Sequence, residues 1–261
     1  LVDSLARNIA GWKTWLPALL AEAPAALAED ALRMTAERQG AMPGWITLIR
    51  HLADAAGDVD AFSATYTAEA LKTPSVAVEV GRRLLAGDRI EEAGDILRAA
   101  APKPGLRGKP LAPDFDWESL WIDYLDRAGR GEEAQAVRWA SFERTLSAER
   151  AKAFIGRLPD FDDVEAESRA FEVAARSPDF ERGLRFLMEW PALPDAGRMI
   201  ERRSDDIDVG PEAAELWAAK LRRRYPKAAH LLLRRAAAFA FRRRDFKTCD
   251  RLTAEADTIA V

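Results

Sequence analysis

The strongest chemical signal in the sequence is a run of basic residues near its C-terminal end. Between Lys220 and Lys247 the chain carries eleven lysine or arginine side chains and a single acid, Asp245. Guanidinium groups form paired hydrogen bonds with carboxylates and phosphates, so a cluster of them predicts contacts to one of these anions. The residues that we expect to form this interaction surface are Arg222, Arg223, Lys227, Arg234, Arg235, Arg242 and Arg243.

Three interpretations of the basic surface are open. Its side chains form a solvated face that acids on neighbouring helices partly neutralise, or they meet the acidic surface of a protein partner, or they contact nucleic acid or another polyanion. In a helix from Pro226 to about Arg243, positions 227, 234, 235 and 242 share one face. The charges should therefore form a stripe, and its role depends on which side chains lie beside it.

Residues that commonly carry catalysis or bind metals are few and scattered. Cys249, His51 and His230 lie far apart in the sequence and show no metal-ligand spacing. Neither a phosphate-binding loop nor a nucleophile elbow occurs. Carboxylates gather between Asp160 and Glu167, but capping of the helix that follows explains them better than a calcium or magnesium site. We therefore expect a protein that is not an enzyme and that holds no cofactor and no metal.

Helices must position these residues, because apolar side chains recur at helical spacing along almost the whole chain. One example is the stripe formed by Trp117, Leu120, Trp121, Tyr124 and Leu125. Strand-like alternation is absent. The sequence thus predicts an all-α protein of about twelve or thirteen helices joined by short loops, so that neighbouring helices run antiparallel.

Proline and glycine residues mark where these helices begin and end. Thr73 before Pro74 and Ser177 before Pro178 each supply an N-cap oxygen followed by proline at the first helical position, and Pro211 and Pro226 should open helices too. Glycine accepts the left-handed backbone that closes a helix. The predicted helix ends are Gly57, Gly87 and Gly129.

Similar joints recur along the chain and predict an array of helical hairpins. The segments 87–93, 129–134, 178–183 and 244–249 all resemble the turn of a tetratricopeptide-type hairpin, but their separations are unequal. An irregular, tetratricopeptide-like α-solenoid fits better than a strict repeat. We expect N-terminal hairpins over 1–101, a Pro/Gly-rich loop over 102–116 and a helical-repeat region over 117–261, all in one continuous array.

Several segments also resemble an all-helical bacterial family that is catalogued only as a domain of unknown function. The resemblance is strongest from Trp117 to the C-terminus. It implies a helical-repeat fold and no assigned activity. The segments that carry it are GRGEEAQ (129–135), RWASFE (138–143), LPDFDDVE (158–165), FLMEWP (186–191) and LLLRRA (231–236).

Composition limits the remaining possibilities. The chain of 261 residues is 48% hydrophobic and 31% charged, which is typical of a globular protein, and no window is apolar enough to span a membrane. The single cysteine excludes a disulfide-stapled scaffold and favours the cytoplasm. Because the sequence begins at Leu1 without a signal-peptide pattern, we interpret it as a segment of a longer or processed protein. The function that we expect is a non-catalytic scaffold that binds a protein or peptide partner, with nucleic-acid binding through the basic stretch as the alternative.

Overall fold

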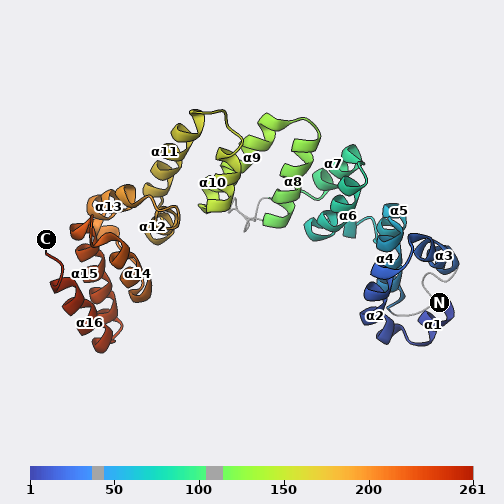
Figure 1. Ribbon diagram of the computed structural model, residues 1–261, viewed down its shortest axis with the longest axis horizontal. Helices are drawn as coiled ribbons and strands as arrows, with labels where there is room; N and C mark the ends of the chain where they lie inside the picture. The colour runs from blue at the N-terminus through green and yellow to red at the C-terminus, as the bar shows by residue number, and fades with distance from the viewer. Residues whose placement is uncertain (37–43, 104–113, 261) are drawn as a thin grey trace. The chain divides into compact units, whose positions relative to one another are not determined.

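The structure is a computed structural model that describes residues 1–36, 44–103 and 114–260. Over these residues the chain forms sixteen α-helices and no β-strand, which confirms the all-α class (Figure 1). The chain divides into two compact units, Leu1–Ala134 and Gln135–Val261, called here the N-terminal unit and the C-terminal unit. This division falls within a helix. The predicted loop over 102–116 belongs to the N-terminal unit, and its residues 104–113 lie outside the described residues.

The N-terminal unit is built from short helices that pack in pairs. In its first half, α1, α2, α3 and α4 enclose a core in which Leu5, Leu16 and Leu52 are fully buried. In its second half, α6 packs against both α7 and α8. The helices are α1 (Val2–Arg7), α2 (Ile9–Glu22), α3 (Ala25–Ala36), α4 (Trp45–Ala56), α5 (Val59–Ser63), α6 (Pro74–Ala86), α7 (Ile90–Ala99) and α8 (Phe115–Arg127), with the 3-10 turn η1 (Ala70–Lys72) before α6.

In the C-terminal unit, alternate helices contact one another. α11 packs on α13 and α13 on α15, while α14 packs on α15 and α16. Leu184 of α12, Leu232 of α15 and Leu252 of α16 are fully buried in one continuous core. The elements are α9 (Gly131–Thr145), which begins before the unit boundary, α10 (Ala148–Ile155), α11 (Asp162–Ala175), α12 (Phe180–Glu189), α13 (Leu193–Arg202), η3 (Ser204–Asp206), α14 (Pro211–Leu221), α15 (Pro226–Arg242) and α16 (Phe246–Asp257).

Several joints between consecutive helices close with the same backbone hydrogen bond. An amide just beyond the helix end donates to a carbonyl five residues earlier, and the residue before the donor takes a positive φ, which is the Schellman arrangement. Short joints of this kind turn the chain back on itself and produce hairpins. The donor and acceptor pairs are Asp58 to Ala53, Arg89 to Leu84, Arg130 to Leu125 and Asp245 to Ala240.

Some predicted helix boundaries are confirmed. Pro211 and Pro226 occupy the first turns of α14 and α15. Gly57 and Gly129 have φ values of 69° and 73°, the left-handed conformation expected of a residue that closes a helix. Thr73 does precede Pro74 at the N-cap of α6, but its side chain forms no capping hydrogen bond.

Two other predictions about helix ends differ from the structure. α6 does end at Gly87, as predicted, but Gly87 has a φ of −87°, and the left-handed residue of that joint is Asp88, with a φ of 59°. Aspartate adopts the left-handed conformation at a lower free-energy cost than most other residues, so this position does not require glycine. Asp179, and not Ser177, caps α12 by accepting a 3.0 Å hydrogen bond from the Arg182 amide. Its carboxylate is a stronger acceptor than the Ser177 hydroxyl.

The number of helices also exceeds the prediction. The described residues contain sixteen α-helices, where the periodicity predicts about twelve or thirteen. α1 and α5 are only 6 and 5 residues long, too short for an apolar stripe to repeat. Packing against longer neighbours, and not their own periodicity, makes them helical. None of the helices in the described ranges is long and apolar enough to cross a membrane.

Candidate functional site

The basic residues singled out from the sequence all belong to the C-terminal unit. Arg222 and Arg223 follow the end of α14, and the others lie along α15 or directly after it. All seven side chains are exposed. Their exposure leaves open whether they are available to a partner, because an exposed cation can still be neutralised by an acid of the same protein.

The first half of α15 is neutralised in this way. Each of its three basic residues forms an ion pair with an acid from a neighbouring element, which is the solvated, partly neutralised face that the sequence left open. The pairs join Lys227 to Glu201 of α13 (3.7 Å), Arg234 to Asp257 of α16 (3.7 Å) and Arg235 to Asp205 of η3.

Near this paired half, the ring of His230 also has a partner. Its Nδ1 lies 3.2 Å from the carbonyl oxygen of Ala256, which can only accept, so this nitrogen carries the proton. This hydrogen bond ties α15 to α16.

The second end of α15 differs. Arg242 and Arg243 form no ion pair with the described residues, and their guanidinium carbons lie 5.9 Å and 5.5 Å from the centre of the Phe239 ring. Arg223 likewise has no acidic partner among the described residues, and Arg222 donates only a long 3.4 Å hydrogen bond to the Thr258 hydroxyl. The structure thus separates the predicted surface into a neutralised part and a part that retains its charge.

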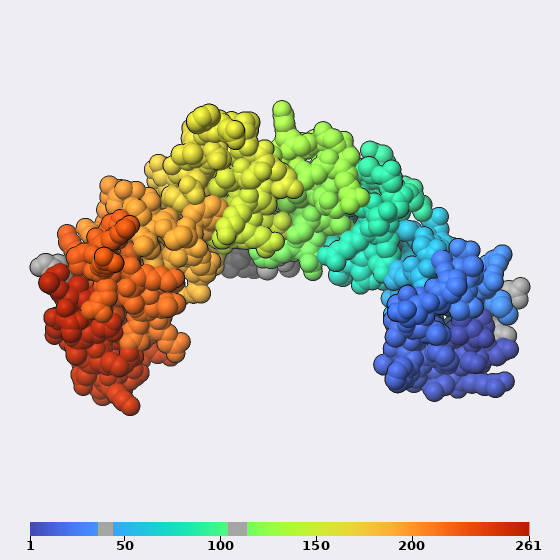
Figure 2. Space-filling view, viewed as in Figure 1, coloured from blue at the N-terminus to red at the C-terminus, as the bar shows by residue number. Residues whose placement is uncertain are grey.

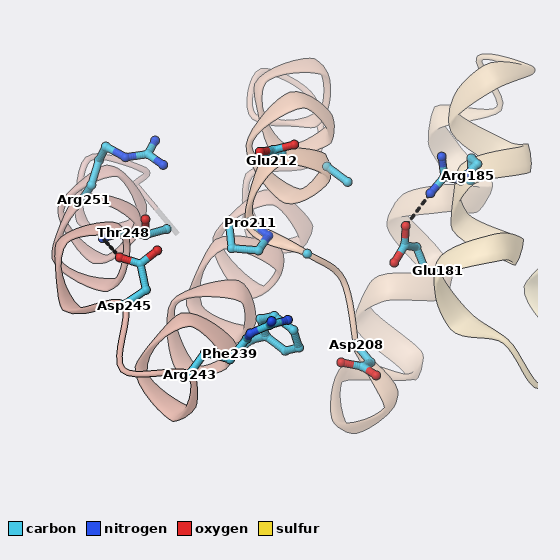
Figure 3. A pocket seen from close by; sticks show the side chains of 12 residues that line it. Glu181, Arg185, Asp208, Pro211, Glu212, Phe239, Arg243, Asp245, Thr248 and Arg251 are labelled. Carbon is cyan, nitrogen blue, oxygen red and sulfur yellow. Dashed lines mark hydrogen bonds and ion pairs between the residues drawn. The ribbon is translucent and has the colours of Figure 1, made fainter.

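A pocket of about 680 Å³ opens beside this charged end (Figure 3). Figure 3 shows the first turn of α14 in the middle, α12 to its right, α16 to its left and the end of α15 below, and each of these helices supplies lining side chains. Seven of its twelve lining residues are charged. They are Glu181, Arg185, Asp208, Glu212, Arg243, Asp245 and Arg251.

Some of these charges are already satisfied within the protein. Arg185 pairs with Glu181 one turn earlier on α12, and Arg251 pairs with Glu215 on α14. In contrast, Asp208 and Glu212 form no ion pair or side-chain hydrogen bond with the described residues. The pocket therefore offers two available carboxylates and, at Arg243, one available guanidinium.

Asp245 sits at the rim of the pocket as the N-cap of α16. Its carboxylate accepts a 3.1 Å hydrogen bond from the Thr248 amide. Hydrogen bonding from Thr248, with a smaller contribution from the charge of Lys247, lowers the pKa of Asp245 below its usual value. Asp245 is therefore ionised at neutral pH. Its carboxylate caps α16 and forms no ion pair with the neighbouring Arg243 or Arg244.

The remaining candidates from the sequence have structural roles. Cys249 is half-buried against the core of the C-terminal unit, as expected of a packing residue. No group of three or more possible metal ligands occurs in the part of the chain that is described. The expectation that carboxylates cap α11 is confirmed in part: the N-cap residue is Phe161, which forms no side-chain capping bond, but Asp163 accepts a 2.8 Å hydrogen bond from the Val164 amide in the first turn. Asp162, Asp163 and Glu165 still lie in the first turn, where they complement the helix dipole.

Sequence reasoning missed the pocket itself. From the sequence alone, the segment before Pro211 is interpreted as an ordinary polar turn that contains Asp205, Asp206 and Asp208. In the structure the first of them neutralises Arg235, whereas Asp208 faces the pocket. No local signal distinguishes these two aspartates, because the difference arises from which helix packs beside each one.

The family model described as "Family of unknown function (DUF6880)" matches residues 13–258. The chain belongs to this family. The match covers most of both units, so it confirms the resemblance found in the sequence and extends it to the N-terminal hairpins. No curated protein and no solved structure matches the chain.

Proposed function

We propose that this member of the DUF6880 family is a non-catalytic, cytoplasmic scaffold that binds an extended peptide segment of a protein partner in the pocket between α12 and α14. The observation that carries this proposal is the combination of available charges at one site. Asp208 and Glu212 accept hydrogen bonds from peptide N–H groups, and Arg243 donates to a carbonyl or a carboxylate.

The chemistry of the lining supports a peptide over a small organic ligand. Pockets for small molecules are mostly apolar with a few polar groups, whereas seven of the twelve residues here are charged. A polypeptide brings regularly spaced donors and acceptors that match both signs of charge. The hairpin joints are also consistent with a tetratricopeptide-like, irregular solenoid, an architecture whose stacked helices present such surfaces.

Site-specific photocrosslinking in the cells that naturally make the protein tests this proposal. A benzophenone amino acid placed at Ala213, which lines the pocket, should form an adduct with a defined protein. The same group at Ala219, an exposed residue of α14 outside the pocket, is the matched control and should form none. Glu212→Lys should abolish the Ala213 adduct. Equal crosslinking from both positions, or none from Ala213, would reject the pocket as the binding site.

A further inference from the structure

Two exposed aromatic rings lie at the joint between α15 and α16. Phe241 is 60% exposed and Phe246 is 55% exposed, and their ring centres are 5.6 Å apart at an interplanar angle of 70°. Figure 2 shows this part of the C-terminal unit, in red, on the molecular surface. Rings that contribute to a core are shielded from water, so this pair adds little to folding and remains free to contact another molecule.

Four cations are close neighbours of the two rings in the sequence. Arg242, Arg243, Arg244 and Lys247 are all exposed, and none forms an ion pair with the described residues. The cations earlier on α15 behave differently, since Lys227, Arg234 and Arg235 are each held by an acid. Part of the unpaired charge of the basic stretch therefore lies in the same segment as the exposed rings, where the ionised Asp245 offsets one of the four positive charges. This segment, comprising Phe241, Arg242, Arg243, Arg244, Phe246 and Lys247, is called the aromatic joint below.

One of these cations occupies a costly backbone position. Arg244 has a φ of 62°, at the same place in the Schellman turn that Gly57 and Gly129 occupy in other joints. A side chain in the left-handed region is disfavoured relative to glycine. The aromatic joint thus carries an arginine where the fold alone favours glycine.

We propose that the aromatic joint binds single-stranded nucleic acid, with bases stacking on Phe241 and Phe246 and the four cations contacting the phosphates. Proteins that bind single strands combine exposed aromatic faces with uncompensated positive charge, and both occur together here. A duplex fits less well, because its bases are already stacked on one another. An acidic peptide would use the cations but would leave the exposed ring faces without an equivalent partner.

Fluorescence anisotropy with a labelled oligothymidylate of about 15 nucleotides tests the proposal on the full chain. Binding near 50 mM salt should weaken steeply as salt rises. The slope of log affinity against log salt concentration should become shallower by about 2 in the triple variant Arg242→Gln, Arg244→Gln, Lys247→Gln. Each phosphate contact to a single strand contributes about 0.7 to this slope. Phe241→Ala or Phe246→Ala should weaken binding about tenfold with the salt slope unchanged, since stacking releases no counterions.

The chain supplies its own matched controls. Arg234→Gln with Arg235→Gln removes two charges from the same helix, but from the neutralised half, and should leave oligonucleotide affinity and salt slope unaltered. Arg244→Gly should lower the slope by about 0.7 while the thermal midpoint stays equal or rises, because glycine suits the positive φ. That variant separates loss of binding from loss of folding. Arg243 is left unchanged throughout because it also lines the pocket, so the peptide proposal is tested separately.

Three results would overturn the proposal. The first is a parent protein that shows no salt-dependent binding at 50 mM salt. The second is an equal loss of slope in the Arg234 and Arg235 control, which would indicate diffuse charge. The third is a combination of two observations. Polyglutamate competes as effectively as unlabelled oligothymidylate, and Phe241→Ala and Phe246→Ala leave the affinity unchanged. This third pattern would assign the aromatic joint to an acidic protein segment.

Discussion

The two ends of α15 carry similar basic side chains in different surroundings. At its first half, Arg234 and Arg235 reach acids of α16 and η3 and are neutralised. At its second end, Arg242 and Arg243 form no ion pair with the described residues, and both guanidinium groups lie near the Phe239 ring. The comparison teaches that the charge density of a sequence segment does not measure its available charge. Neighbouring elements decide which cations are left for a partner.

The largest expected difference between the two ends concerns apolar side chains. Leu232→Ala should lower the free energy of unfolding by about 2 to 5 kcal/mol, because this fully buried side chain would leave a cavity in the core. Phe241→Ala should cost less than about 1 kcal/mol, because most of the ring is already in water and alanine favours the helix. Urea unfolding of both variants measures the difference. A loss of more than 2 kcal/mol for Phe241→Ala would mean that the ring serves the fold.

Charge reversal should produce the next largest difference. Arg234→Glu combined with Arg235→Glu should destabilise the protein by about 1 to 2 kcal/mol, since two surface ion pairs become two repulsive contacts. Arg242→Glu combined with Arg244→Glu should change the free energy of unfolding by less than about 0.5 kcal/mol, because no acid of the described residues pairs with either arginine. Adding Asp205→Arg to Arg235→Glu should restore part of the loss. Without that restoration, the Arg235 pair would have no measurable role in stability.

The smallest expected effect is a pH dependence at the second end. Because hydrogen bonds from Thr248 lower the folded-state pKa of Asp245, its contribution to stability is fully present above the unfolded-state pKa of about 4. The contribution is lost as the pH falls through the lower folded-state value. Unfolding midpoints between about pH 2 and 6 should therefore vary less in Asp245→Asn than in the parent. Lys247→Gln should change this dependence only slightly, and a larger change would show that charge, not hydrogen bonding, holds the carboxylate ionised.

Local sequence patterns predicted most of the helices but not all of their boundaries. Pro211 and Gly57 act through their own backbone preferences, so their roles are visible in the sequence alone. Arg244 adopts the left-handed conformation without that preference, because the hydrogen bonds of the joint impose it. Short helices such as α5 were missed for a related reason, since contacts with longer helices stabilise them.

By itself, the sequence determined the helical class of this protein and the placement of eleven cations in one stretch, because helical periodicity and composition are local properties. Only the tertiary structure decided which of those cations remain available. Arg235 meets Asp205 from thirty residues earlier in the chain, and Arg234 meets Asp257 from the following helix. Electrostatic attraction depends on distance in space, and the fold sets that distance by bringing Asp205 of η3 and Asp257 of α16 beside α15.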